Sequence, residues 1–153
     1  MFSKLKLITV SIAFPLLFGF LGSLLGDSKS GYEMLIQPTF APPAFIFPIV
    51  WTILYILMGI SSYIIYTSDS TNKNNALIIY VSQLVLNSLW TLFFFRFELL
   101  LFSFWWILLI IAFVVLMIYN FYKIKPIAAY LQIPYLLWLI FAAILNYSIY
   151  LLN

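Results

Sequence analysis

The sequence predicts an all-α membrane protein, a polytopic bundle of five transmembrane helices in a single domain of residues 1–153. Of the 153 residues, 66% are hydrophobic and only 7% are charged, and a soluble fold of this length would need far more charged surface. Apolar runs of about 20 residues, the length that crosses a bilayer, recur along the chain with polar turns between them. All four acidic residues lie in those turns, which leaves the expected bilayer centre free of carboxylates.

Cysteine and histidine are both absent. Their absence excludes disulfides, thiol redox chemistry, the usual zinc sites, histidine-based catalytic triads and the common axial ligands of haem. The net charge of +3 comes from basic residues placed singly or in pairs, which is typical of membrane orientation and not of a nucleic-acid surface. We therefore expect the lipid bilayer as surroundings, no nucleic-acid partner, no metal and no resident cofactor.

The first span is expected at about residues 7–26. It is too long for the apolar part of a signal peptide and lacks a small-x-small cleavage site, and Pro15 is tolerated within it as a kink. Gly22 and Gly26 form a small-xxx-small pair, which lets another helix approach closely. We expect that contact to be packing within one chain rather than a dimer interface.

A polar connection at residues 27–42 precedes the second span, expected at about 43–66. A connection of this length is more often functional than idle. Pro42 and its neighbour Pro43 suit the first turn of a helix, where their missing N–H groups cost nothing. One face of the helix carries Trp51 and Tyr55 one turn apart, so the connection is predicted to be a lid over an aromatic cavity.

The remaining spans are expected at about 76–95, 99–122 and 127–152. The fourth is almost wholly leucine, isoleucine, phenylalanine and valine and is expected to lie mostly against lipid. Pro134 should kink the fifth. Five spans put the termini on opposite sides, and most of the basic residues fall on the side of the N-terminus. The positive-inside rule then predicts a cytoplasmic N-terminus and an outside C-terminus.

Polar and aromatic residues form one stripe on each of three spans, in the half nearest the 27–42 connection. The stripes comprise Trp51, Tyr55, Met58, Gly59 and Ser62 on the second span, Tyr80, Gln83, Asn87, Trp90 and Phe94 on the third, and Tyr135, Trp138, Ala142 and Asn146 on the fifth. Any one of them alone is explained as helix packing. Their coincidence beneath the segment Tyr32–Pro43 predicts a pocket for a flat apolar molecule held by face and edge contacts. Its anionic groups would point toward Lys29 or Arg96.

The same positions resemble the TspO family, the tryptophan-rich sensory or translocator proteins, also called peripheral benzodiazepine receptors. The matching residues are Gln37-Pro38, Pro42-Pro43, Trp51, Leu54-Tyr55, Met58-Gly59, Gln83-Leu84, Leu86-Asn87, Trp90, Phe94-Phe95, Pro134-Tyr135, Trp138, Phe141-Ala142 and Leu145-Asn146. They cover four of the five spans in the right order; the fourth span matches by hydropathy alone.

The resemblance implies a five-helix bundle, usually dimeric, that binds protoporphyrin IX as ligand or substrate and also binds isoquinoline and benzodiazepine drugs. It implies light-dependent porphyrin breakdown that depends on Trp51 and Trp138, the two candidate catalytic residues. By position, it places Tyr32, Pro42, Asn87, Trp90, Ala142 and Asn146 around the ligand; Tyr55 joins them from the stripe. Phe40 and Phe45 stand where the family often has tryptophan, and Leu151 stands where the cholesterol pattern of animal members needs a base, which argues against cholesterol binding.

Two other functions stay open at the level of sequence. A transporter of porphyrin or another amphipathic ligand would fit the pocket, although the spans lack charges for ion coupling and the chain lacks inverted repeats. A regulatory membrane subunit without a ligand would need the stripes for packing alone. Saturable porphyrin binding would separate these hypotheses.

Overall fold

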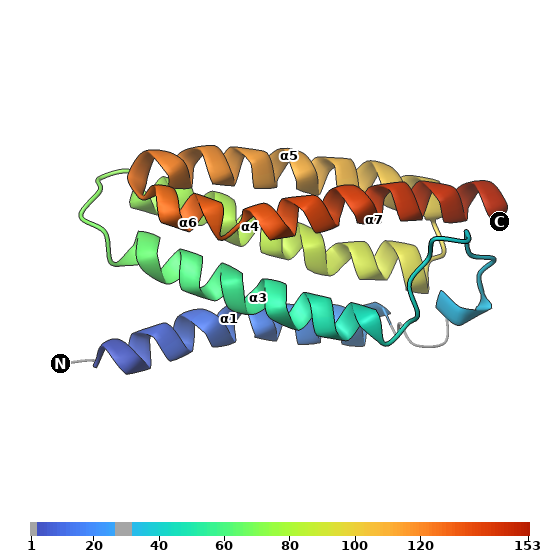
Figure 1. Ribbon diagram of the computed structural model, residues 1–153, viewed down its shortest axis with the longest axis horizontal. Helices are drawn as coiled ribbons and strands as arrows, with labels where there is room; N and C mark the ends of the chain where they lie inside the picture. Colours follow the sequence, from blue (N-terminus) through green and yellow to red (C-terminus); the bar gives the residue numbers. More distant parts are fainter. Residues whose placement is uncertain (1–2, 27–31) are drawn as a thin grey trace.

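Five long apolar helices form the bundle in the computed structural model, which describes residues 3–26 and 32–153. Successive helices run up and down, so the two termini lie at opposite ends of the bundle (Figure 1). The helices are α1 (Lys4–Gly26), α3 (Ile46–Tyr66), α4 (Lys73–Thr91) with its π-helical continuation η1 (Leu92–Arg96), α5 (Leu100–Ile124), and α6 (Pro126–Tyr130) followed by α7 (Ile133–Leu152). The prediction of an all-α, five-helix membrane protein is confirmed.

The third span ends in a wide turn and not in a regular α-helix. In η1 the backbone N–H of Phe97 donates to the carbonyl of Leu92 at 3.0 Å, five residues back, which is the π-helical pattern. Glu98 follows with φ of 54°, a left-handed conformation that turns the chain sharply toward α5. Because of this wide turn, the third span does not end where a straight α-helix would end. Three phenylalanines lie within η1.

The fifth span is two helices, not one kinked helix. The chain turns at Leu131 and Gln132, and Pro134 occupies the first turn of α7, where its missing N–H leaves no bond unmade. The short α6 is fixed to α3, because the hydroxyl of Ser61 donates to the carbonyl of Ala128 at 2.7 Å.

Glycines set the closest helix contacts. Gly59 of α3 lies directly against the backbone of Ile12 in α1. Gly22 and Gly26 of α1 lie against α4, where the hydroxyl of Thr91 donates to the carbonyl of Gly22 at 2.6 Å. The expectation that this glycine pair packs within one chain is confirmed.

The fourth span, which was expected to lie mostly against lipid, also has a buried face. Ile107 and Ile110 of α5 are buried, and α5 packs against both α4 and α7. The helix most exposed to lipid is α1, since only 11% of its most apolar stretch is buried, against 28% for α5. A purely apolar sequence fits either environment, because lipid tails and a protein core are equally apolar.

Candidate functional site

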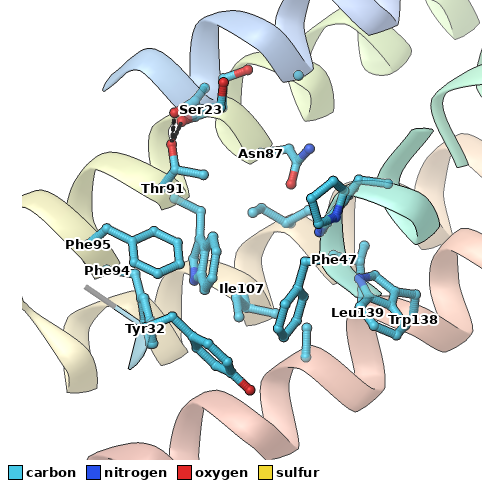
Figure 2. Close-up of a pocket in the computed structure, with 18 of the residues that line it drawn as sticks. Ser23, Tyr32, Phe47, Asn87, Thr91, Phe94, Phe95, Ile107, Trp138 and Leu139 are labelled. Atoms are coloured by element: carbon cyan, nitrogen blue, oxygen red, sulfur yellow. Dashed lines mark hydrogen bonds between the residues drawn. The ribbon is translucent and has the colours of Figure 1, made fainter. Parts of the chain in front are cut away.

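A cavity of about 500 Å³ lies between α1, α3, α4, α5 and α7, in the half of the bundle nearest the lid segment 32–45. Residues of both α1 and α7 line it. Figure 2 shows Ser23 and Thr91 on one side of the cavity, with Trp138 and Leu139 on the other. Drug-sized ligands occupy cavities of roughly 300–1,000 Å³ lined mainly by apolar and aromatic side chains. The size and the lining are both in that range.

The structure gathers most of the residues singled out by sequence around this cavity. Those in its wall are Tyr32, Trp51, Tyr55, Asn87, Trp90, Trp138, Ala142 and Asn146. Pro42 is not in the wall; its carbonyl accepts a hydrogen bond from the Tyr32 hydroxyl at 2.9 Å and so fixes the lid instead. Lys29, one of the two predicted anchors for anionic groups, lies outside the described residues. The other, Arg96, is exposed, with its guanidinium 3.5 Å from the carbonyl of Leu25.

The two asparagines of the wall are fixed by neighbours. Asn87 donates to the Tyr55 hydroxyl at 2.9 Å, which joins α4 to α3. Asn146 accepts from the Trp90 indole at 3.1 Å and donates to the carbonyl of Leu100 at 2.9 Å. Asn146 therefore joins α7 to both α4 and the start of α5. Buried polar groups in a bilayer are expected to be paired in this way.

In the described part of the chain, the indole N–H of Trp138 is unpaired, unlike those of Trp90 and Trp106. This N–H is buried and has no hydrogen-bond partner among the described residues. The ring packs on Phe141 with centroids 5.2 Å apart and against Phe47 at 5.9 Å. An unpaired buried donor costs about 1–3 kcal/mol. The N–H has essentially no accessible surface, so Trp138 presents its ring, and not its N–H, to the cavity.

Stacked aromatic pairs form two further parts of the wall. Trp51 stacks on Tyr55 with centroids 5.5 Å apart, and Trp90 stacks on Phe94 at 4.8 Å. Such pairs contribute about 0.5–1.5 kcal/mol beyond the area they bury. They hold the indoles in place whether or not the cavity is filled.

The lid is fastened at several points. Tyr32 is 5% exposed, and its backbone carbonyl accepts from the Gln37 amide at 2.8 Å. Burial raises the pKa of the Tyr32 phenol, so the phenol stays protonated and able to donate to Pro42. The side chain of Asn153 pairs with Ile36 twice: the Ile36 N–H donates to it at 3.1 Å, and its amide donates back to the Ile36 carbonyl at 2.9 Å.

Six stripe residues are buried outside the cavity wall: Met58, Gly59, Ser62, Tyr80, Gln83 and Tyr135. Tyr135 is buried, and its hydroxyl donates to Gln83 at 2.6 Å. Tyr80 lies in the same core cluster. These groups fill the half of the bundle farther from the lid, so the stripes continue past the floor of the cavity.

Sequence reasoning missed the contributions of α1 and α5. Gly19, Phe20 and Ser23 of α1 and Ile107 and Ile110 of α5 all line the cavity. Gly19 lies against the ring of Tyr55, so the missing side chain there makes room for an aromatic residue of the wall. A glycine one helical turn before Gly22 and Ser23 was the signal in α1; the isoleucines of α5 gave none, since they are typical of any apolar span.

Comparison with known proteins gives a consistent result. The model of the TspO/MBR family matches residues 11–152. The chain is 36% identical to the tryptophan-rich protein TspO of Archaeoglobus fulgidus over 152 residues, which cover 97% of each chain. It is 34% identical to the protein of the same description from Chlorobaculum tepidum, covering 95% of each. It is also 33% identical to the translocator protein of Sus scrofa, covering 89% of this chain and 83% of the other.

The matched residues include α3, α4, α5, α6 and α7 and most of α1, and therefore every helix of the cavity wall. The chain is an integral membrane protein and belongs to the TspO/MBR family.

Proposed function

We propose that this protein binds a flat, aromatic, metal-free ring compound in the cavity, with protoporphyrin IX as the first candidate. The observation that carries the proposal is a cavity of about 500 Å³ with aromatic side chains in its wall, among them Trp51, Trp90 and Trp138. These three indoles would contact such a ring. The rest of the lining would hold the ring by face and edge contacts.

Trp51 and Trp138 are the residues proposed to contact the ring and to act on it in the light. Electron transfer from an indole to an excited porphyrin needs close contact and no acid–base pair. Dioxygen would then add across a carbon–carbon double bond of the ring, which breaks to give two carbonyl groups, and the electron would return to the indole radical. Trp51 stacks on Tyr55, which places a second oxidisable ring beside the first. Isoquinoline and benzodiazepine compounds, which are flat and carry acceptor atoms, belong to the same proposed ligand class.

The proposal includes the orientation of the protein. Lysines 4, 6, 73, 123 and 125 lie at the N-terminal end of the bundle, and Arg96 lies at the other. The positive-inside rule puts the lysine-rich end in the cytoplasm. The lid and the cavity would then face the outer half of the membrane.

Binding is tested by titrating the purified protein in nanodiscs with protoporphyrin IX and following tryptophan fluorescence. The wild type should show saturable quenching. Trp138→Phe should bind about two- to tenfold more weakly, since an aromatic contact is worth about 0.5–1.5 kcal/mol. Trp105→Phe is the matched control: Trp105 is 61% exposed and does not line the cavity. No saturable quenching in the wild type would leave a membrane subunit without this ligand.

The photochemical part needs a separate experiment. Protoporphyrin IX is irradiated with the wild type, with the double variant Trp51→Phe/Trp138→Phe and with Trp105→Phe. The porphyrin absorption band should disappear faster with the wild type and the control than with the double variant, at equal porphyrin occupancy. Equal loss in all three samples would remove the proposed catalytic role and leave binding alone.

A further inference from the structure

Helix α1 changes its neighbour along its length. Its first half packs on α3, where Gly59 lies against the backbone of Ile12, and Gly19 still lies against Tyr55. Beyond that point α1 follows α4: the hydroxyl of Ser88 donates to the carbonyl of Phe18 at 3.0 Å, and Gly22 has its nearest contacts on α4. The second half of α1 and the first half of α3 therefore separate as they approach the lid.

The separation lies beside the cavity. Of the residues that line the cavity, four are exposed and the others are not, and all four belong to these two segments. They are Phe20 and Ser23 of α1 and Pro48 and Thr52 of α3, which we call the lateral portal. A residue that is part of a cavity wall and is also exposed marks an opening of that cavity. Because both helices span the membrane, this opening faces lipid.

The end of the cavity toward the lid is closed by bonds that access from water would have to break. Tyr32 is bonded to Pro42 and Gln37, and Ile36 is bonded twice to Asn153. Each such bond contributes about 0.5–1.5 kcal/mol to keeping the lid in place. Entry of a ligand through the described part of the lid is therefore more costly than entry through the lateral portal.

The chemistry of the lateral portal suits the passage of an apolar molecule. The hydroxyl of Ser23 donates to the carbonyl of Phe20 at 2.7 Å, and that of Thr52 donates to the carbonyl of Pro48 at 2.6 Å. Both hydroxyls are thus committed to their own helices, and no portal residue is charged. A ring can slide between the helices without breaking a hydrogen bond of the rim.

The depth of the lateral portal suits an amphipathic molecule. Ser23 is three residues from the end of α1, and Thr52 is six residues from the start of α3, which corresponds to depths of about 5 and 9 Å below the helix ends. A flat ring at that depth has its polar tail at the level of the lipid headgroups. This is where an anionic amphiphile rests in a bilayer.

We infer that the ligand enters and leaves this cavity sideways from the outer part of the lipid layer, between α1 and α3, while the lid stays shut. The inference depends on the proposed function and adds the source of the ligand: a flat amphiphile dissolved in the membrane. Residues of the lateral portal then set how fast the ligand exchanges. They affect that exchange more than they affect the affinity.

The test narrows the lateral portal with Ser23→Phe/Thr52→Phe. The matched control is Thr9→Phe/Ile53→Phe on the same two helices: Thr9 and Ile53 are exposed, neither lines the cavity, and the Thr9 hydroxyl is bonded to its own helix as in Ser23. Protoporphyrin IX is supplied already dissolved in the lipid of the nanodiscs, and binding and release are followed by stopped-flow fluorescence. In the portal variant the association rate constant should fall about tenfold, a larger change than that in Kd. The control should match the wild type.

A second version avoids any effect on folding. The chain has no cysteine, so Ser23→Cys can be labelled with a bulky maleimide after purification, with labelled Thr9→Cys as its control. Labelling at position 23 should slow exchange in the same way, and labelling at position 9 should not. Smaller labels at position 23 should slow it less.

Three outcomes would overturn the inference. Unchanged rates in the portal variant and the labelled protein, with saturable binding by the wild type, would refute lateral access and leave the proposed function intact. A raised Kd with an unchanged association rate would make these residues part of the binding wall only. Faster binding in Asn153→Ala, with no effect of the portal changes, would put the route through the lid. Absence of binding by the wild type would instead refute the proposed function itself.

Discussion

Replacing Gly59 by alanine should force α1 and α3 apart. A Cβ at this position would lie 2.7 Å from the carbonyl oxygen of Ser11 and 2.9 Å from the backbone nitrogen of Ile12, and closer still to the Ile12 Cα. All three atoms belong to helix backbone, so no side chain can rotate away. The helices must shift at the place where they cross.

The magnitude follows from two opposed effects. Overpacking costs about 1–3 kcal/mol, and a backbone obstacle puts Gly59→Ala near the upper end. Alanine is favoured over glycine inside a helix by about 1 kcal/mol. The net loss should therefore be about 2 kcal/mol. Gly22→Ala is the matched control, because its new Cβ would lie 3.4 Å from the nearest atom, the Cα of Ser88, which is ordinary contact. That variant should be as stable as the wild type or more stable by up to about 1 kcal/mol.

The assay is unfolding in mixed micelles with a rising fraction of denaturing detergent, followed by circular dichroism. Gly59→Ala should unfold at a clearly lower fraction than the wild type, and Gly22→Ala at the same or a higher one. Equal midpoints for the two variants would refute the reasoning, because the same substitution would then be insensitive to the difference in contact.

Two further predictions concern the lid. Asn153→Ala removes both bonds to Ile36 and should increase amide hydrogen exchange in residues 32–42, with a loss of about 1–3 kcal/mol in local protection; Asn120→Ala, whose amide bonds only to its own helix, should leave that exchange unchanged. The pKa of the Tyr32 phenol is raised in the folded lid, so the folded lid retains a proton that the open lid releases. The lid is therefore fully stabilised below the ordinary tyrosine pKa of about 10. It loses that stabilisation as the pH rises through the higher pKa of the folded state. Amide exchange in the lid should therefore rise more steeply above about pH 10 in the wild type than in Tyr32→Phe, which has no phenol to ionise; parallel pH profiles would contradict this.

The helices could be predicted because bilayer thickness alone sets their length. The predicted positions 7–26, 43–66 and 99–122 lie within a few residues of α1, α3 and α5. The end of α4 and the break in the fifth span could not be read in the same way. A π-helical turn and a helix restart before Pro134 both depend on what neighbouring helices supply to the freed backbone groups, and hydropathy carries no information on that.

The arrangement around the cavity was predictable where side chains are unusual for a membrane and not where they are ordinary. Asn87 and Asn146 are costly to expose to lipid, so their periodicity identifies an inward face. Ile107 is as stable in lipid as in a cavity wall, and its sequence gives no reason to choose. Asn153 directly follows the expected fifth span. Its pairing with Ile36 joins positions 117 apart in the sequence, a contact that no local pattern indicates.

The volume of the cavity is maintained by interactions among its wall residues. A cavity collapses when its wall residues can rotate inward, and here the large ones cannot. Trp90 is held by the stack on Phe94 and by its bond to Asn146, and Trp51 is stacked on Tyr55, whose hydroxyl accepts from Asn87. Binding at such a site involves little reorganisation of the wall, so the area buried by a ligand converts more fully into affinity.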